Sequence, residues 1–173
     1  SSEATGRVRS RYVDAITLRC FAHDTLLTLA GHATVPVVNA LTARSHPCQI
    51  MADLQTMIGR HGALDGQIVT WIGDGNNVAA SWIEAAARFN FQLRLACPEG
   101  YAPPAELMAW ARAEGADLVL YDSALEAARG SQTLVTDVWI SMGDEEGTRR
   151  EDFKPFQVNE ELLAAAAGDA VVM

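Results

Sequence analysis

Short apolar runs rich in β-branched residues alternate along the chain with stretches whose apolar residues recur every three or four positions. The first pattern predicts buried strands, and the second predicts helices with one apolar face. Alternation of this kind with short connections is typical of a parallel sheet that helices cover on both faces. The sequence therefore predicts the α/β class with a Rossmann-like, doubly wound sheet, which binds ligands at the carboxyl ends of its strands.

The predicted elements fall into two groups joined by one helix. In the first group, strands over 12–18 and 35–39 flank a helix over 22–31. The joining helix begins at Pro47, and its apolar stripe of Ile50, Met51, Leu54, Met57 and Ile58 ends near 59–62. The second group predicts strands over 68–72, 91–96, 118–121, 133–137 and 170–173, and helices over 77–90, 103–114 and 124–129.

Charge and composition exclude several classes of partner. Thirteen basic and twenty-two acidic residues give a formal net charge of −9, without a basic cluster. Nucleic acids and anionic membranes both select clustered Lys and Arg, so we expect neither as a partner. Three widely spaced cysteines form no CxxC pattern, and no apolar run is long enough to span a membrane. These features predict a cytoplasmic protein without a disulfide framework or zinc site.

A Gly-Asp-Gly turn separates strand 68–72 from the next helix, in the sequence WIGDGNNVAASW over 71–82. The first amides of that helix lack partners within the helix, so they can attract an anion. Alternatively, Gly73 and Gly75 only permit a tight turn while Asn76 or Asn77 caps the helix. A nucleotide-binding fingerprint is a weaker interpretation, because the third glycine and the later acidic residue are missing.

Two further motifs also follow strands or begin helices. Asp137 opens DVWISMG over 137–143, and an aspartate there is often only a turn residue. If it faces Asn77, however, Asp137 can hold an ammonium group while Asn77 and the amide of Met142 hold a carboxylate.

His46 and Gln49 in SHPCQIM lie three residues apart, so both side chains can project from the first helical turn and bind a small planar group. A lone histidine at a helix start is, however, more often a cap.

Taken in order, the motifs HPCQ, GDGNN and DVWISMG resemble the transcarbamylase family, specifically its ornithine carbamoyltransferases. The similarity extends from RSRYVDAITLR to FQVNEELLAAA and so covers nearly the whole chain. Aspartate carbamoyltransferases share the HPxQ element but lack the pairing of GDGNN with SMG. The resemblance implies a fold of two α/β domains, with 1–45 as the tail of a carbamoyl-phosphate domain, 46–65 as the interdomain segment and 66–173 as a truncated ornithine domain.

The resemblance also implies roles for individual residues. Arg19 and His46 would be catalytic and would bind carbamoyl phosphate together with Gln49. Asn77, Asp137, Ser141 and Met142 would bind ornithine through its α-amino and α-carboxylate groups. The implied reaction is attack of the uncharged δ-amine of L-ornithine on carbamoyl phosphate, which gives L-citrulline and phosphate without a metal or an organic cofactor.

The resemblance is incomplete at both ends. The family's Ser-Thr-Arg-Thr motif, which should precede this segment, and its His-Cys-Leu-Pro motif, which should begin just after Met173, are absent. We therefore expect the chain alone to turn over ornithine poorly, and the homotrimer that the family forms is less certain for such a fragment. A catalytically inactive amino-acid-binding module and a nucleotide-binding Rossmann-type domain remain alternatives.

The remaining polar and aromatic candidates receive structural interpretations. The four tryptophans, Trp71, Trp82, Trp110 and Trp139, are expected to pack in strands and helices. His23, His32 and His61 are expected at the surface. The segment 144–152 is expected to be a solvated loop, or a lid that closes over ornithine.

Overall fold

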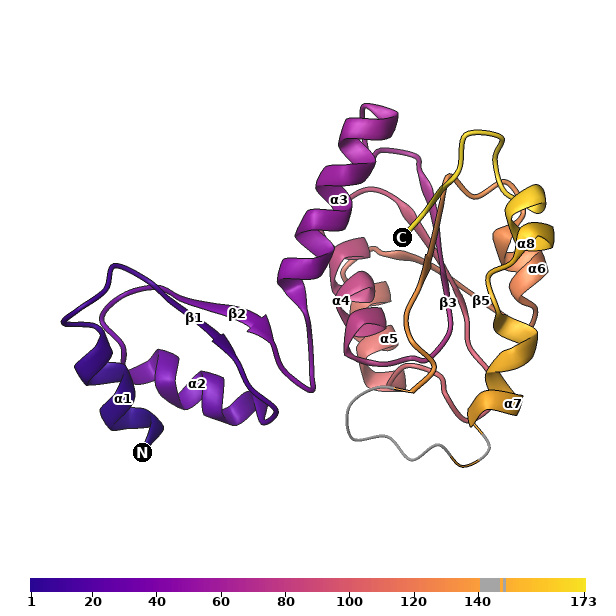
Figure 1. Ribbon diagram of the computed structural model, residues 1–173. Coiled ribbons are helices and arrows are strands. Elements are labelled where there is room, and N and C mark those ends of the chain that lie inside the picture. The colour runs from indigo at the N-terminus through magenta and orange to yellow at the C-terminus, as the bar shows by residue number, and fades with distance from the viewer. Residues whose placement is uncertain (141–146, 148) are drawn as a thin grey trace.

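The computed structural model describes residues 1–140, 147 and 149–173, and they form two α/β parts joined by a long helix (Figure 1). The smaller part has a sheet of two parallel strands and two helices that pack on each other. Its elements are α1 (Ser2–Arg9), β1 (Ile16–Arg19), α2 (His23–His32) and β2 (Val37–Leu41). Helix α3 (Pro47–His61) then leads from the smaller part to the larger one.

The larger part is a five-stranded parallel sheet with the order β5-β4-β3-β6-β7. Its strands are β3 (Ile68–Ile72), β4 (Gln92–Ala96), β5 (Asp117–Tyr121), β6 (Thr133–Thr136) and β7 (Val171–Val172). The helices between them are α4 (Asn77–Ala86), α5 (Ala105–Ala113), α6 (Ala124–Ala128), α7 (Arg149–Phe153) and α8 (Glu160–Ala165), with a 3₁₀ turn, η1 (Lys154–Phe156). The chain proceeds from β3 through β4 to β5 at one edge and returns to the other side of β3 at β6, so the strand order reverses between β3 and β6.

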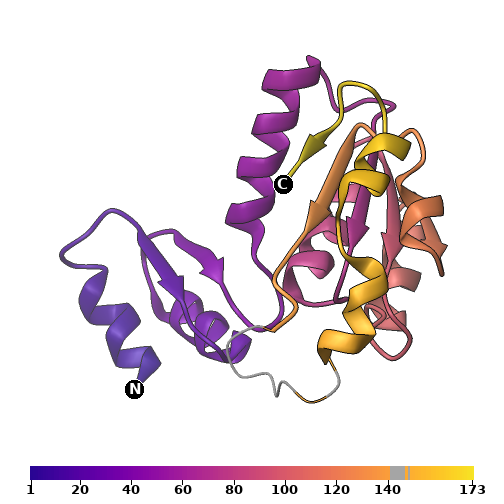
Figure 2. The same cartoon turned by 45° about the vertical axis from the view of Figure 1, so that its right-hand side comes forward.

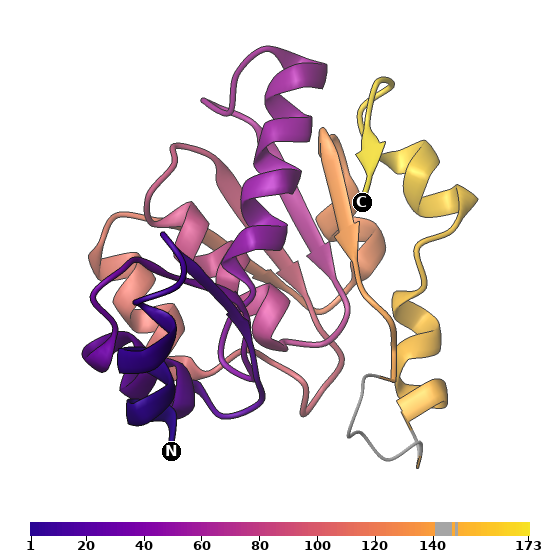
Figure 3. The ribbon, with the colours of Figure 1, turned by 60° about the vertical axis from the view of Figure 1, so that its left-hand side comes forward.

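Each face of the large sheet has its own apolar core. On one face α3, α4 and α5 pack on the sheet around Trp71 and Trp82, which are fully buried. On the other face α6 and α8 pack around Ile72 and Leu134. Figure 3 shows α3 lying across the first face, and Figure 2 shows β7 beside β6 at the edge. The predicted α/β class, with a parallel sheet and helices on both faces, is therefore confirmed.

Several predicted boundaries are wrong. The strand expected over 12–18 begins at Ile16, because Tyr12 lies in a turn and is 81% exposed. The helix expected to reach residue 90 ends at Ala86, after which the chain forms turns. Helices α1 and α8 were not predicted, and the loop expected over 144–152 already contains the start of α7 at Arg149.

The stripe on α3 is only partly buried. Ile50, Leu54 and Met57 are at most 3% exposed, whereas Met51 and Ile58 are 57% and 47% exposed. Helix α3 packs against β2 of the smaller part and α4 of the larger part. It thereby connects the two sheets.

The histidines and cysteines also differ in their surroundings. The His61 side chain is only 5% exposed, so the expected surface position is wrong for it, and His23 and His32 are half-buried. The three cysteines are unpaired. Within the described residues, no helix has the length and apolar character needed to cross a membrane.

Candidate active site

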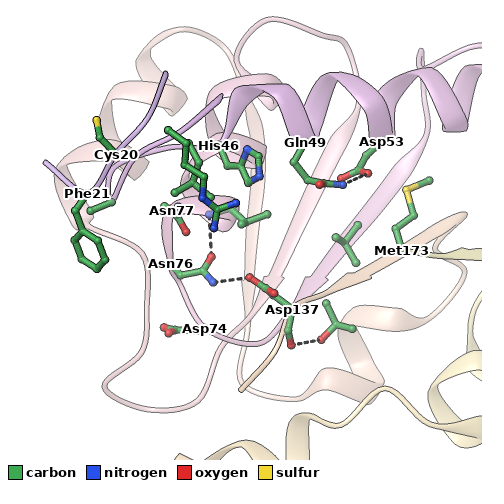
Figure 4. A pocket seen from close by; sticks show the side chains of 16 residues that line it. Cys20, Phe21, His46, Gln49, Asp53, Asp74, Asn76, Asn77, Asp137 and Met173 are labelled. Carbon is green, nitrogen blue, oxygen red and sulfur yellow. Dashed lines mark hydrogen bonds between the residues drawn. The ribbon is translucent and has the colours of Figure 1, made fainter. Parts of the chain in front are cut away.

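A crevice of about 740 Å³ opens where the two parts of the chain meet, at the carboxyl ends of β1, β3 and β6. This is the side of the large sheet where parallel α/β folds bind ligands, and β3 and β6 flank the point where the strand order reverses. Figure 4 shows side chains from both parts directed into it. The predicted residues that line it are Arg19, His46, Gln49, Asn77 and Asp137. Ser141 and Met142, which were also predicted, lie outside the described residues.

The turn after β3 depends on its glycines for packing. A Cβ atom on Gly75 would lie 2.6 Å from the backbone of both Tyr101 and Ala102, so only glycine fits there. Gly73 has φ of 142°, a conformation that L side chains rarely adopt. The indole nitrogen of Trp71 donates to the Asp74 carbonyl at 2.9 Å, which further fixes the turn. This local structure sets where α4 begins.

Asn76 caps α4 and also contacts the predicted ammonium-binding carboxylate. Its Oδ1 accepts hydrogen bonds from the amides of Val78 and Ala79, at 2.9 and 3.1 Å. Its Nδ2 donates to Oδ2 of Asp137 at 3.0 Å (Figure 4). Asp137 also accepts from the amide of Val138 at 2.7 Å. Because each carboxylate oxygen can accept two hydrogen bonds, Asp137 keeps acceptor capacity for a ligand.

Asn77 and the start of α3 are held together across the crevice. The Nδ2 of Asn77 donates to the carbonyl of Thr42 at 2.8 Å, which uses one of its two N–H groups. The backbone N–H of His46 donates to Oγ of Ser81 at 2.7 Å, and that hydroxyl donates to the Asn77 carbonyl at 3.0 Å. The proposed carbamoyl-phosphate and amino-acid residues are therefore linked by hydrogen bonds.

Burial and the neighbouring charge of Arg19 lower the pKa of His46, and they outweigh the opposite effect of Asp53 and Asp137. The imidazole is therefore neutral at neutral pH, with one N–H donor. A neutral donor can hydrogen-bond a carbonyl oxygen without carrying a charge of its own. Arg19, at the end of β1, supplies a positive charge at the same end of the crevice.

Asp53 also lines the crevice, although sequence reasoning missed it. Its Oδ1 accepts a hydrogen bond from Nε2 of Gln49 at 2.9 Å, and the residue is 9% exposed. Burial raises the pKa of this carboxyl group, an effect that the Gln49 hydrogen bond only partly offsets. The available signal was its position four residues after Gln49, which places both side chains on one face of α3.

An ion pair connects the turn after β3 to the start of α7. The guanidinium of Arg149 lies 2.5 Å from the Asp74 carboxylate, and both side chains are at most 20% exposed. Arg149 also donates through Nε to the carbonyl of Trp139 at 2.8 Å, and its guanidinium stacks on the rings of Tyr101 and Phe153. Arg149 therefore anchors the chain on both sides of 141–146. Of the predicted lid over 144–152, residues 144–146 and 148 lie outside the described residues, and 149–152 belong to α7.

Two family profiles match the chain. The one described as "Aspartate/ornithine carbamoyltransferase, Asp/Orn binding domain" matches residues 65–173, and the one described as "Aspartate/ornithine carbamoyltransferase, carbamoyl-P binding domain" matches residues 1–59. Among curated proteins, an ornithine carbamoyltransferase of Rhodopseudomonas palustris (strain BisA53) is 51% identical over 170 residues, which cover 98% of this chain and 54% of the relative. One from Bradyrhizobium diazoefficiens is 52% identical over 98% of this chain and 55% of its own length.

Solved structures give the same match. The ornithine carbamoyltransferase of Pyrococcus furiosus superposes with a TM-score of 0.92 at 40% identity, covering 100% of this chain and 57% of that one. The enzyme of Thermus thermophilus gives 0.88, also at 40% identity, covering 99% and 56%. The chain therefore spans about half the length of the relatives that it matches.

Proposed function

Because the chain belongs to the aspartate/ornithine carbamoyltransferase family, we propose that its crevice binds L-ornithine and carbamoyl phosphate and serves carbamoyl transfer between them. The δ-amine of ornithine attacks the carbonyl carbon, the bond from that carbon to the bridging oxygen breaks, and phosphate leaves with the electron pair. The amine loses one proton, and the products are L-citrulline and phosphate. The reaction belongs to the synthesis of arginine precursors.

One observation carries this proposal: groups for both substrates converge on one crevice from distant parts of the sequence. Asp137 follows the end of β6 and Asn77 begins α4, while Arg19 ends β1 in the smaller part and His46 caps α3, the helix that joins the two parts. Asp137 supplies a carboxylate for the α-ammonium group, and Asn77 retains an N–H group for the α-carboxylate. Ser141 and Met142 complete this ornithine site in the proposal.

Arg19, His46 and Gln49 form the carbamoyl-phosphate end. Negative charge develops on the carbonyl oxygen during attack, and donors already held in place stabilise it, each by about 3–4 kcal/mol in comparable sites. Arg19 and the neutral His46 are such donors. The link from His46 through Ser81 to Asn77 keeps this end aligned with the amino-acid end.

The domain division that we propose follows the same reasoning, with 1–45 in a carbamoyl-phosphate domain, 46–65 between domains and 66–173 in an ornithine domain. Separate sheets in the two parts support it. A homotrimer is part of the proposal through the family resemblance, and a cytoplasmic location fits the three unpaired cysteines. The inactive module and the nucleotide-binding domain gain no support from the relatives, which are ornithine carbamoyltransferases.

Calorimetry with L-ornithine, in the presence and absence of carbamoyl phosphate, tests the assignment of Asp137. We expect Asp137→Ala to weaken ornithine binding at least about tenfold, because it removes a charge-assisted interaction worth about 1.5–3 kcal/mol. Asp122→Ala is a matched control, since Asp122 is an exposed aspartate that follows β5 at the sheet edge. Ornithine binding that is equal in the parent chain and Asp137→Ala would contradict the proposal.

A further inference from the structure

Gln49 and Asp53 form a hydrogen-bonded pair on the crevice side of α3. Both residues line the crevice, and Figure 4 shows them side by side near His46. Nε2 of Gln49 donates to Oδ1 of Asp53 at 2.9 Å. The end of Gln49 that faces a ligand is therefore decided by its neighbour.

A carboxylate constrains the direction of an amide in a way that few other partners do. The two ends of a glutamine amide have nearly the same shape, so an unconstrained side chain can present either its N–H groups or its carbonyl oxygen. An ionised aspartate has no donor, and its Oδ1 still accepts when the other oxygen carries a proton. Asp53 therefore holds the Nε2 end of Gln49 and leaves Oε1 as the end available to a ligand.

The burial of Asp53 argues against a purely local role on the helix. The residue is 9% exposed, and the adjacent positions Ile50, Leu54 and Met57 belong to the apolar core. Removing a carboxylate from water is unfavourable, as the raised pKa of Asp53 indicates. An exposed Gln–Asp pair would stabilise the helix at less cost. A buried carboxyl group that faces a cavity is more typical of a functional site.

We infer that Asp53 is a positioning residue that presents the side-chain carbonyl of Gln49 to the crevice and so selects a carbamoyl NH₂ group over a group without N–H donors. The inference rests on the proposed function, since it names the part of carbamoyl phosphate that Gln49 recognises. Acetyl phosphate is the informative competitor, because a methyl group replaces the NH₂ group on an otherwise similar acyl phosphate.

The test is to titrate the chain with carbamoyl phosphate and, separately, with acetyl phosphate. NMR of the backbone amides around the crevice monitors both titrations. We expect the parent chain to bind carbamoyl phosphate more tightly than acetyl phosphate. In Asp53→Asn the neighbour can donate or accept, so Gln49 can present either end, and the preference should fall about three- to tenfold. Asp53→Glu keeps a pure acceptor and should retain more of the preference than Asp53→Asn.

A double-mutant cycle separates positioning from general structural damage. Gln49→Ala should itself lose the preference, and adding Asp53→Asn to it should cause no further loss if Asp53 acts through Gln49. Asp117→Asn is the matched control. Its carboxylate accepts from Nε2 of Gln92 at 2.8 Å, but this exposed pair lies between β4 and β5, away from the crevice.

Each outcome decides between defined alternatives. A preference for carbamoyl phosphate that Asp53→Asn leaves unchanged, or that falls equally in Asp117→Asn, would overturn the inference while the proposed function stands. Equal binding of carbamoyl phosphate and acetyl phosphate by the parent chain would also overturn the inference while the proposed function stands. No binding of carbamoyl phosphate by the parent chain would overturn the proposed function, and the inference with it.

Discussion

Asn76 performs two tasks that can be separated by mutation. It caps α4 through Oδ1 and holds Asp137 through Nδ2. We expect Asn76→Ala to lower the free energy of unfolding by about 1 kcal/mol, as loss of a cap does, and also to weaken ornithine binding. Asn159→Ala is the matched control, because Asn159 caps α8 by accepting from Leu162 and does not line the crevice.

The two measurements are chemical denaturation and ornithine calorimetry. Both variants should lose similar stability, and only Asn76→Ala should lose ornithine affinity. If both variants bound ornithine as the parent chain does, the contact between Asn76 and Asp137 would have no role in binding.

The buried carboxyl group of Asp53 makes stability depend on pH in a predictable direction. Its pKa is raised in the folded state above the ordinary value of 3.8, so the folded chain holds this proton more tightly than the unfolded chain. The stability associated with Asp53 is present below pH 3.8 and is lost as the pH rises through the folded-state pKa. Asp53→Asn removes this titration, so its unfolding free energy relative to the parent chain should rise over the same interval.

Urea denaturation of both proteins, at acidic and at neutral pH, measures that difference. A difference between Asp53→Asn and the parent chain that stayed constant across this range would show that burial does not perturb Asp53.

Sequence patterns identified the crevice residues that belong to contiguous motifs, but not those that act through a neighbour. His46, Gln49 and Asp137 each stand in a short motif at a helix start or strand end. Asp53 stands among apolar residues of a helix, and its one local signal, a position four residues after Gln49, does not separate it from an ordinary surface aspartate. Arg149 lies 75 positions from Asp74, and its contact with that residue follows only from the folded chain.

At the scale of elements, the turn between β3 and α4 depends on close packing against residues 101–103. Gly75→Ala places a methyl group against backbone atoms that cannot move independently. We expect a loss of roughly 1–3 kcal/mol in the free energy of unfolding, together with weaker ornithine binding because the start of α4 is displaced. Gly59→Ala is the control, since a Cβ atom there meets nothing within 4 Å, and alanine should stabilise α3 by about 0.5–1 kcal/mol.

Thermal or urea unfolding of Gly75→Ala and Gly59→Ala measures these changes in the free energy of unfolding. Equal stability in Gly75→Ala and the parent chain would mean that the turn does not need its glycine.

Elements were predictable where the apolar pattern was continuous and bounded by turn residues. Strand β3 is a continuous run of β-branched and aromatic residues between polar turns, and its predicted bounds are correct. Tyr12 and Val13 have the residue types of a strand, yet both are exposed in the structure, so their pattern alone was misleading. Helices α7 and α8 are five and six residues long, too short for a helical period to establish itself in the sequence.

At the scale of the whole molecule, the two parts contribute different groups to one crevice, so neither part has the complete proposed site. Arg19 comes from the smaller part, whereas Asn77 and Asp137 come from the larger part. Two separate alternations of strand and helix in the sequence predicted two parts. Their meeting at one crevice could not be derived from either alternation, because it depends on how α3 packs on β2 and α4.

The most direct test of the central claim is citrulline formation by a chimera. In it, residues of this chain replace the matching segment of the Rhodopseudomonas palustris relative, to which it is 51% identical over 170 residues. The relative supplies the segments that flank the replaced one in its own sequence, and these 173 residues do not contain those segments. We predict that the chimera forms L-citrulline from L-ornithine and carbamoyl phosphate, that Asp137→Ala in the chimera greatly reduces this rate, and that the 173-residue chain alone forms little or none. A chimera that unfolds as cooperatively as the relative but forms no citrulline would contradict the account.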